Sequence, residues 1–283
     1  MPEGDTIFRA ARTLHKALSG RVVTRFQSVF PQLTRIDVDR PLAGRTIERV
    51  TSRGKHLLIW FSGDLVLRTH MRMNGSWHIY RQGERWQRPR HDMRIVVSTD
   101  AFEAVAFTVP VAEFGSAADI EGDLETVGPD PLSEAFDHSE AVRRLRARGD
   151  MEIADALLDQ RAVAGIGNVY KSELLFAAHV NPFSAVADLT DETLEKLVSL
   201  AVKFMRANVT DGTTAAIVTY TGFRRTTGRA DPSARLWVYG RGGQPCRRCG
   251  TPISRRKQGP NARSTYWCEK CQRQTLQPSA PSQ

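Results

Sequence analysis

The sequence predicts an α+β protein of several domains: a β-sandwich that begins with a helix, a helical domain and a small four-cysteine module. Three observations carry this prediction. Short strand-like runs fill residues 21 to 109, helical periodicity dominates residues 138 to 208, and all four cysteines lie between residues 246 and 271. With 283 residues, 41% of them hydrophobic, the chain can form two compact domains and an appendage.

The amino-terminal domain is expected to span residues 2–118. A helix opens it, because Asp5 can cap a turn after which apolar residues recur at helical spacing until Gly20. Strand-like runs follow at residues 21–26, 46–50, 56–61, 65–70, 76–80, 93–98 and 103–109. Many short strands separated by turns are typical of a β-sandwich.

Residues 119–136 contain two glycines and two prolines, which is typical of an interdomain connector. A helical domain is then expected over residues 137–235, with helices at 138–148, 153–159, 169–178 and 191–208. Its segment 210–234 is rich in Thr, Gly and Arg and is expected to be a long functional loop or partly disordered. The cysteine module would cover residues 236–275, and residues 276–283 a disordered tail.

The cysteines form a C-x2-C-x18-C-x2-C array of Cys246, Cys249, Cys268 and Cys271. Two close pairs joined by a loop let four thiolates converge on one ion, so this spacing predicts one structural Zn²⁺ in a zinc finger. The metal would hold together a segment too short and too polar to bury a core of its own. Two disulfides or four idle thiols are the alternatives, and the amino terminus does not resemble the secretory signal that would favour disulfides.

Positive charge is concentrated on the same module. Residues 241–273 hold nine Lys and Arg against one acid, Glu269, which gives +8 of the chain's net +9. A clustered cationic surface favours a polyanion, so nucleic acid is the expected partner, with a solvated basic tail as the alternative. No apolar run approaches the ~18 residues of a membrane span. We therefore expect a soluble, cytoplasmic, nucleoid-associated monomer without membrane contact.

The amino terminus carries a second chemical signal. Met1 precedes Pro2, a small residue of the kind that permits removal of the initiator methionine, and removal would leave a free secondary amine beside Glu3. An α-amino group titrates near ~8, so part of it is unprotonated and nucleophilic at neutral pH, and a neighbouring carboxylate can shuttle its proton. A frayed, functionless start of the chain is the alternative.

Five motifs occur in order along the chain, the last just before the cysteines: Pro2-Glu3-Gly4, Arg53-Gly54-Lys55, Leu158-Asp159-Gln160, Ala164-Gly165-Ile166-Gly167-Asn168 and Val238-Tyr239-Gly240-Arg241. In this combination nearly the whole chain resembles the formamidopyrimidine-DNA glycosylase and endonuclease VIII family of base-excision repair. The resemblance implies a β-sandwich, a helix-two-turn-helix domain and a zinc finger. It also implies that double-stranded DNA with damaged bases or abasic sites binds between the two main domains.

The resemblance implies a bifunctional DNA glycosylase and AP lyase. The amine of Pro2 would attack C1′ of a flipped-out nucleotide, form a Schiff base and allow β- and δ-elimination. Glu3 would be the general acid/base, and Lys55 would contact phosphate and assist β-elimination. Arg263, at the position of the family's finger arginine, would grip the phosphates beside the lesion. Without the motif, Lys55 would be an exposed lysine at a strand end.

Further DNA contacts follow from the resemblance. Asn168 begins a helix whose amides favour phosphate, although an ordinary helix N-cap is the alternative. Arg72 and Met73, in the loop 70–74, would fill the gap left by the flipped base, with plain hairpin packing as the alternative. Phe114 is expected as a second wedge, and His91 as a phosphate contact or a structural histidine.

Two departures from the family pattern concern the substrate. Formamidopyrimidine-type members carry Pro-Arg-Arg-Phe where this chain has Pro110-Val111-Ala112-Glu113-Phe114, and Thr6 replaces an acid, with Asp5 one position earlier. The start of the chain looks closer to endonuclease VIII-like members, so oxidised pyrimidines are the expected lesions. A catalytically silent zinc-dependent DNA-binding protein is the alternative. A zinc enzyme is disfavoured, because four thiolates leave no open position for water.

Overall fold

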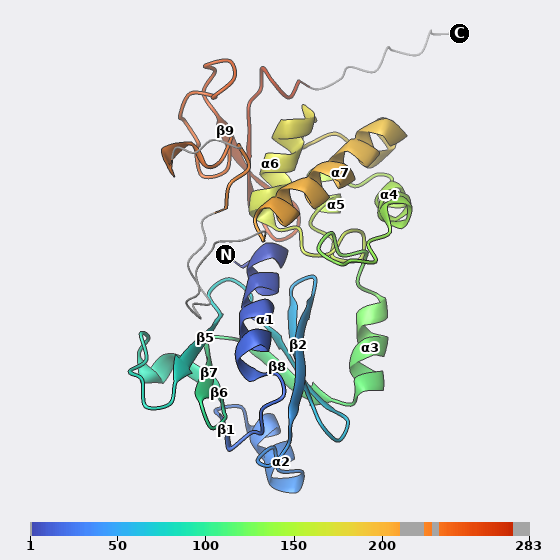
Figure 1. The fold of residues 1–283 in the computed structure, drawn as a ribbon. Helices are drawn as coiled ribbons and strands as arrows, with labels where there is room; N and C mark the ends of the chain where they lie inside the picture. The colour runs from blue at the N-terminus through green and yellow to red at the C-terminus, as the bar shows by residue number, and fades with distance from the viewer. Residues whose placement is uncertain (1, 210–223, 228–231, 274–283) are drawn as a thin grey trace, which may run out of the picture.

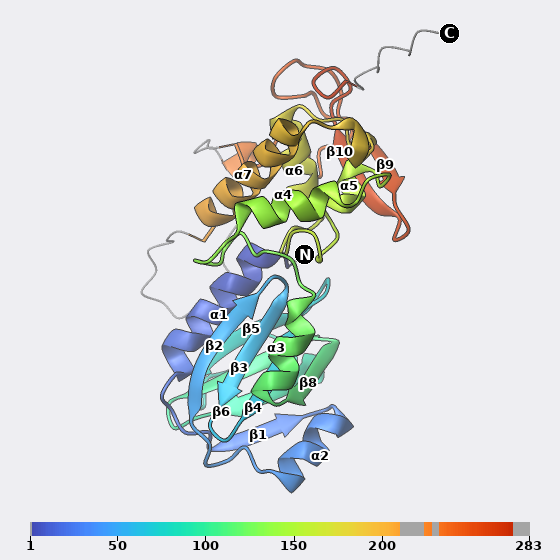
Figure 2. The same cartoon turned by 90° about the vertical axis from the view of Figure 1, so that its right-hand side faces the viewer.

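The computed structural model describes residues 2–209, 224–227 and 232–273, and it has a β-rich amino-terminal domain below a helical domain that carries the finger (Figure 1). The start of the chain lies where the two domains meet, and the same arrangement is seen after a quarter turn (Figure 2). The predicted fold class is confirmed. Most of the segment 210–234 and the whole tail 276–283 lie outside the described residues.

Helix α1 (Gly4–Leu18) joins the two domains. Its buried face includes Ile7, Leu14 and Leu18 and packs into the sandwich, whereas Phe8 packs against the core of the helical domain. The N-cap residue is Glu3, not Asp5 as predicted from the sequence. Asp5 is instead fully buried and paired with distant residues, so its carboxylate is not available to cap its own helix.

Two four-stranded antiparallel sheets form the sandwich. One has the order β1 (Arg25–Ser28), β6 (Met93–Ser98), β7 (Phe102–Phe107), β5 (Ser76–Arg81); the other has the order β2 (Ile47–Arg53), β3 (His56–Phe61), β4 (Leu65–His70), β8 (Val111–Gly115). Apolar side chains such as Ile59, Leu67, Trp77 and Ile95 are buried in one core cluster of this domain. The helix α2 (Pro31–Asp39) and the strand β8 were not predicted.

The expected connector is partly helical. Residues Ala117–Glu125 form α3, which starts at a capping box between Ser116 and Asp119. Ile120 and Leu124 of α3 pack on Leu58 and Trp60, which face away from the sandwich core. This cover explains why β3 is apolar on both faces. The glycines and prolines of this stretch predicted a loop, but the cap and the apolar pair favour a helix.

The helical domain consists of α4 (His138–Arg146), α5 (Ile153–Ala156), α6 (Asn168–Ala178) and α7 (Asp191–Ala207), close to the predicted positions. Short 3-10 turns occur at η2 (Val186–Asp188) and η3 (Pro232–Ala234), and a further one, η1 (Arg90–Asp92), lies in the amino-terminal domain. Ten of the eleven residues of α6 are buried. A helix buried on all sides needs partners around its whole circumference, and α6 contacts the amino terminus, the other helices and the finger.

The finger contains one hairpin, β9 (Ser254–Gln258) and β10 (Arg263–Trp267), in antiparallel register. Its small apolar cluster includes Val238, Ile253 and two of the cysteines, and it packs on Phe176 of α6. The hairpin therefore lies directly against the central helix of the neighbouring domain.

Candidate active site

Glu3 is fixed at the amino end of α6. Its side chain is fully buried; Oε1 accepts a hydrogen bond from Val169 N at 2.8 Å, and Oε2 accepts one from Tyr170 N at 3.3 Å. Helix amino ends attract anions through free N–H groups and the helix dipole. The sequence predicted phosphate at these amides, but the structure shows the Glu3 carboxylate occupying two of them, directly after the buried Pro2.

Glycines make this close approach possible. Gly4 N donates to Gly165 O at 2.9 Å, and a side-chain carbon on Gly4 would lie 2.9 Å from Gly165 Cα. A side-chain carbon on Gly167 would overlap the Glu3 carboxyl group. The motif at residues 2–4 and the motif at residues 164–168 therefore contact each other, and this contact holds the amino terminus against α6.

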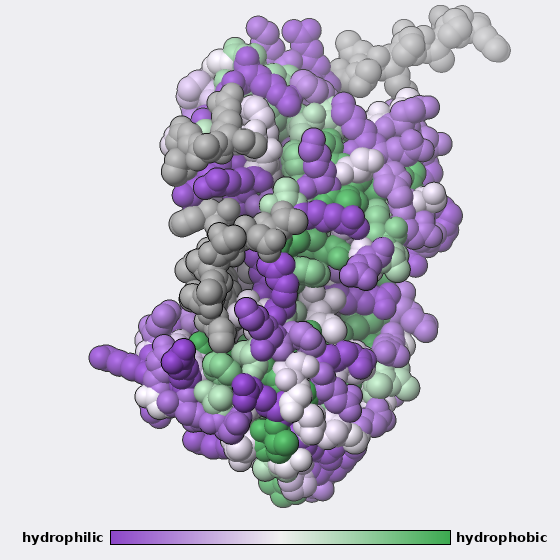
Figure 3. All heavy atoms as spheres, in the orientation of Figure 1, coloured by the Kyte–Doolittle hydropathy of each residue, from purple (hydrophilic) through white to green (hydrophobic). Residues whose placement is uncertain are grey.

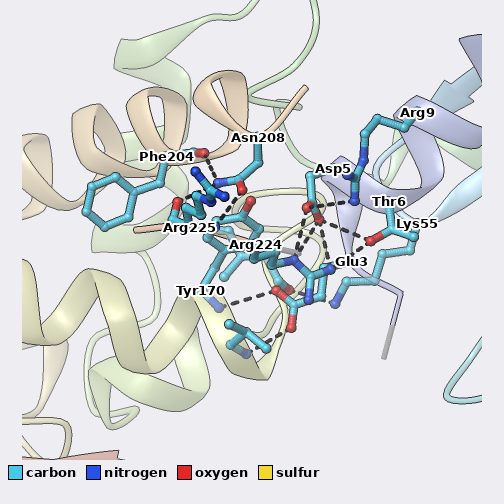
Figure 4. Close-up of polar contacts among 12 residues, drawn as sticks. Glu3, Asp5, Thr6, Arg9, Lys55, Tyr170, Phe204, Asn208, Arg224 and Arg225 are labelled. Carbon is cyan, nitrogen blue, oxygen red and sulfur yellow. Dashed lines mark hydrogen bonds and ion pairs between the residues drawn. The ribbon is translucent and has the colours of Figure 1, made fainter. Parts of the chain in front are cut away.

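Lys55 lies beside this corner, in the turn between β2 and β3. Its Nζ donates to Ile166 O at 2.6 Å, next to the glycine that contacts Glu3. Figure 4 shows Lys55 beside Glu3. Burial is the main cause that lowers the pKa of Lys55 to about 8; Glu3 opposes the shift, and Arg263 and Arg224 add to it. Lys55 is thus an amine that gains and loses its proton near neutral pH, not an ordinary lysine at a strand end.

The turn that carries Lys55 is anchored to the connector. Asp130 Oδ2 accepts a hydrogen bond from Gly54 N at 2.7 Å, and Oδ1 accepts one from Leu132 N at 2.9 Å. Gly54 has φ +59, a left-handed conformation that favours glycine. Asp130 therefore fixes the backbone just before Lys55, a link between distant segments that no local sequence pattern indicated.

Arg263, in the finger, contacts the loop 70–74 of the amino-terminal domain. Its Nη1 lies 3.4 Å from Met73 Sδ, and Met73 is 48% exposed. In this loop Met71 is buried in the core of the sandwich, whereas Arg72 is exposed with φ +50. Met71 thus anchors the loop and leaves Arg72 and Met73 outside, which is the arrangement that a wedge into stacked bases requires.

Asn168 reaches the finger. The N-cap of α6 is Gly167, so the alternative of an Asn168 cap is wrong. Asn168 Nδ2 donates to Ser264 O at 2.8 Å, while one turn of helix away Lys171 Nζ donates to Thr265 Oγ1 at 2.8 Å. Both side chains of α6 therefore hold the strand β10 that begins with Arg263.

Two other predicted DNA contacts lie elsewhere in the amino-terminal domain. Phe114 is in β8, with its ring 5.5 Å from the ring of Phe26 and 6.4 Å from that of Phe61, measured between centroids. A side chain packed against the core in this way does not serve as a free wedge. His91 lies in η1 with 82% of its side chain exposed, 3.7 Å from Asp92, and is accessible to a phosphate.

The four cysteines converge as predicted. Their sulfur atoms all lie within 4.8 Å of one another, with Cys249 Sγ 3.4 Å from Cys268 Sγ and Cys246 Sγ 3.9 Å from Cys271 Sγ. Four thiolates around one zinc at ~2.3 Å place their sulfurs about 3.8 Å apart, so this donor set fits a tetrahedral structural zinc. All four cysteines are free, which excludes the disulfide alternative for this structure.

Not all of the finger's positive charge faces outward. Arg241 donates to Trp237 O, Arg247 donates to Leu236 O, and Arg248 donates to Phe176 O while its guanidinium covers the ring of the same residue. These three arginines hold the finger to its neighbours. Arg255, Arg256 and Lys257 are exposed on β9, and in Figure 3 hydrophilic residues predominate over this end of the molecule.

Glu173 is a buried anchoring residue of α6 that the sequence did not reveal. It is fully buried and accepts hydrogen bonds from Trp237 N, Val238 N and Tyr239 N at 2.7, 2.9 and 2.9 Å, and another from the hydroxyl of Thr226. Burial raises the pKa of Glu173, and the four donated hydrogen bonds oppose that rise. Glu173 thereby ties the segment that enters the finger to α6.

A cavity of about 780 Å³ also lies at the domain junction, between α1, β2 and residues 127–135. Phe8, Arg12 and Arg53 are among its lining residues, but Pro2, Glu3 and Lys55 are not. The predicted catalytic residues therefore lie outside this cavity, at the corner by the amino end of α6.

Residues 1–111 match the formamidopyrimidine-DNA glycosylase N-terminal domain, and residues 127–219 the formamidopyrimidine-DNA glycosylase H2TH domain. Residues 243–274 match the zinc finger found in FPG and IleRS. The solved complex of the Lactococcus lactis Fpg with an abasic site containing DNA has the same fold, with a TM-score of 0.80 and 24% identity over 96% of this chain and 100% of that one. The domains and their order therefore define a DNA glycosylase of the helix-two-turn-helix class.

Curated relatives agree with this class. A probable endonuclease 8 2 of Streptomyces coelicolor is 42% identical over 275 residues, which is 96% of this chain and 94% of that protein. The DNA-(apurinic or apyrimidinic site) lyase Nei2 of Mycolicibacterium smegmatis is 37% identical over 96% of this chain and 99% of that protein. The chain belongs to the formamidopyrimidine-DNA glycosylase and endonuclease VIII family, and it is endonuclease VIII-like. The predicted family and enzyme class are confirmed.

Within the described ranges, no helix combines the length and the apolar character needed to cross a bilayer.

Proposed function

We propose that this chain removes oxidised bases from DNA through its amino-terminal proline and then cuts the strand. The observation that supports this most strongly is the corner in which Glu3, directly after Pro2, is fixed by two amides of α6 with Lys55 alongside. A buried carboxylate held this rigidly next to a lysine of lowered pKa is typical of proton-transfer chemistry.

The glycosylase step uses the imino nitrogen of Pro2 after Met1 is removed. The nitrogen attacks C1′ of the flipped-out nucleotide and loses its proton, while the base departs with the electrons of the glycosidic bond and takes up a proton. The nitrogen lone pair then expels O4′, which takes up a second proton from the solvent, and an iminium ion remains. Glu3 is the group placed to move these protons.

The lyase step follows from the same iminium ion. Removal of a C2′ proton sends its electrons into a C2′–C3′ double bond and expels the 3′ phosphate. A second elimination, which starts from C4′, expels the 5′ phosphate. Lys55 contacts phosphate in its charged form and assists the first elimination, and water finally releases the sugar from Pro2.

DNA is held by residues of both domains. Arg72 and Met73 fill the gap left by the flipped nucleotide, and Arg263 binds the flanking phosphates together with His91 and Asn168. The zinc ion held by the four cysteines keeps β10, and with it Arg263, in place. Phe114 has no part in this arrangement because its ring is packed against the sandwich core.

The substrate class we propose is oxidised pyrimidines. The stretch 110–114 has no arginine, and its last four residues form the strand β8, which pairs with β4. Phe114 of this strand, which the resemblance implied as a second wedge, has its ring against Phe26 and Phe61. Oligonucleotides with single defined lesions test this choice, and faster release of 8-oxoguanine than of oxidised pyrimidines would contradict it.

The central test is reductive trapping. The purified protein is incubated with an abasic-site duplex and borohydride, and a covalent adduct that maps to Pro2 by mass spectrometry is expected. An amino-terminal extension that blocks release of Pro2 should abolish the adduct, whereas the same extension at the carboxyl terminus should not. DNA binding without any adduct would favour the alternative of a catalytically silent DNA-binding protein.

A further inference from the structure

A charged pair that the chemistry above does not use lies beside the catalytic corner: Asp5 in the first turn of α1, and Arg224 far along the chain (Figure 4). The Asp5 side chain is fully buried. Arg224 Nε lies 3.0 Å from each Asp5 oxygen, and Arg224 Nη2 lies 2.8 Å from Oδ1. Arg9 Nη2 is 3.7 Å from the same carboxylate.

The guanidinium of Arg224 reaches two further elements. Its Nη2 donates to Thr6 Oγ1 at 2.9 Å, and its central carbon lies 5.4 Å from the centre of the Tyr170 ring. Tyr170 is the residue whose amide N–H donates to Glu3. One side chain therefore contacts both the first turn of α1 and the first turn of α6, which together hold the catalytic acid.

The backbone next to Arg224 is itself held. Arg225 N donates to Asn208 Oδ1 at 2.8 Å, and Asn208 Nδ2 donates back to Arg225 O at 2.9 Å. Asn208 is the C-cap residue of α7. This reciprocal pair of hydrogen bonds fixes residue 225 to the end of a helix and so directs the preceding side chain toward Asp5.

Arg224 keeps its positive charge in the folded protein. Burial alone would lower the pKa of Arg224, but the carboxylates of Glu3 and Asp5 outweigh it and raise that pKa. Because a buried ion pair with one partner removed leaves an uncompensated charge, the loss of either side chain disturbs the other.

We infer that Arg224 is a positioning residue of the catalytic centre, which fixes Pro2 and Glu3 relative to α6 by holding Asp5 and Thr6. This inference rests on the proposed function. It also gives a role to Asp5 and Thr6, the two residues at which the start of this chain departs from the family pattern.

The test compares Arg224→Met, Arg224→Lys, Asp5→Asn and the double variant Asp5→Asn/Arg224→Met. For each, the single-turnover rate of adduct formation is measured with saturating abasic DNA, and the affinity is measured with a tetrahydrofuran analogue that cannot form an adduct. Misplacement of reacting groups by about 1 Å costs about 100-fold in rate. Arg224→Met should therefore lose about 30-fold or more in rate with affinity within about threefold.

Three further variants test the positioning role of Arg224 more closely. Arg224→Lys, which keeps the positive charge but loses the bidentate guanidinium, should recover part of the rate that Arg224→Met loses. The double variant, which removes both members of the Asp5–Arg224 pair, should be more stable than either single variant but stay slow, because the link to α6 is gone. Arg225→Met, the matched control with an exposed side chain, should keep the wild-type rate at saturating DNA.

The inference is overturned if Arg224→Met traps DNA at the wild-type rate, or if the double variant recovers full speed, which would mean that only a stability ion pair was lost. A wild-type protein that forms no adduct would instead refute the proposed function itself, and the two failures are therefore distinguishable.

Discussion

The amino-terminal domain and the finger are held together by different forces. The sandwich is built around one cluster of 25 buried apolar residues, whereas the finger's cluster has five, of which two are cysteines and one belongs to α6. Apolar burial stabilises a domain in proportion to the area removed from water. The sandwich can therefore fold on its own core, but the finger depends on its metal and on α6.

Polar contacts replace apolar ones where the finger meets α6. Lys171 donates to Thr265, the hydroxyl of Thr265 donates to Gln258 Oε1 at 2.6 Å, and Gln258 Nε2 donates to Glu152 Oε2 at 2.7 Å. Each buried member of such a chain stabilises the fold only while its partner is in place. The finger should therefore unfold cooperatively, whereas the hydrogen bonds from α6 to Glu3 involve no finger residue and should survive.

Removal of zinc is expected to have the largest effect. Chelation should release β9 and β10 and with them Arg263, because metal binding in such modules is coupled to folding. Affinity for abasic DNA, measured by fluorescence anisotropy, should fall by at least about tenfold, since phosphate contacts supply much of the binding energy. The β-sheet signal in circular dichroism should persist to the wild-type melting temperature. Unchanged affinity without metal would contradict the dependence of the finger on zinc.

Substitution Glu173→Ala should have the next largest effect. It leaves three backbone N–H groups of residues 237–239 buried without their acceptor. Unsatisfied buried groups cost ~1–3 kcal/mol each, and entry of water recovers part, so we expect a loss of about 3 kcal/mol in the free energy of unfolding. Denaturant titration measures this loss. Glu195→Ala, an exposed position on α7, is the control and should cost less than about 0.5 kcal/mol.

The sequence was most informative where a pattern is local. Strands β3, β4 and β6 lie at the predicted residues, because their apolar runs are bounded by turns. The cysteine array predicted its own geometry, since two close pairs have few ways to meet. In α3 two local signals conflict. Gly122 suggested a connector, whereas the capping box at Ser116 favours the helix that forms.

Local sequence patterns could not predict the contacts between residues far apart in the chain. The amides of α6 that suggested a phosphate site bind Glu3 from 166 residues away. Asp130, Glu173 and Arg224 act through partners that only the folded chain brings near, and their own surroundings in sequence are ordinary. The pair Arg224–Arg225 lies in a Thr- and Gly-rich stretch that contains none of the five motifs that carry the resemblance. Such residues emerge only from the contacts themselves.

The pH dependence of DNA binding tests the proposed phosphate contact of Lys55, on the amino-terminal side of the domain junction. Lys55 has a pKa of about 8 in the free protein, so it is charged below pH 8 and neutral above it. Bound phosphate favours the ammonium, and binding above pH 8 must therefore take up a proton. Affinity should fall by up to about fivefold from pH 8 to pH 9, as linkage requires for one proton with a pKa of about 8. This part of the slope should vanish in Lys55→Met.

Lys171→Met is the matched control for that slope. Burial lowers the pKa of Lys171 to about 8 as well, but its ammonium donates to Thr265 beneath the finger, whereas that of Lys55 donates to Ile166 O. Its replacement should leave the pH slope of DNA affinity in place. If Lys171→Met removes the slope and Lys55→Met keeps it, the phosphate contact has been assigned to the wrong lysine.

The smallest effect is expected from Asp130→Ala, because the sandwich core holds β2 and β3 even when their turn loses its anchor. Gly54 N and Leu132 N lose their acceptor, at a cost of about 1 kcal/mol. Loosening of the turn should slow strand cleavage by about three- to tenfold relative to adduct formation, since Lys55 is no longer held in place. Asp137→Ala removes a helix cap at a similar cost, ~1 kcal/mol, but has no link to Lys55. Equal slowing in both variants would show that stability, and not the position of Lys55, limits the elimination.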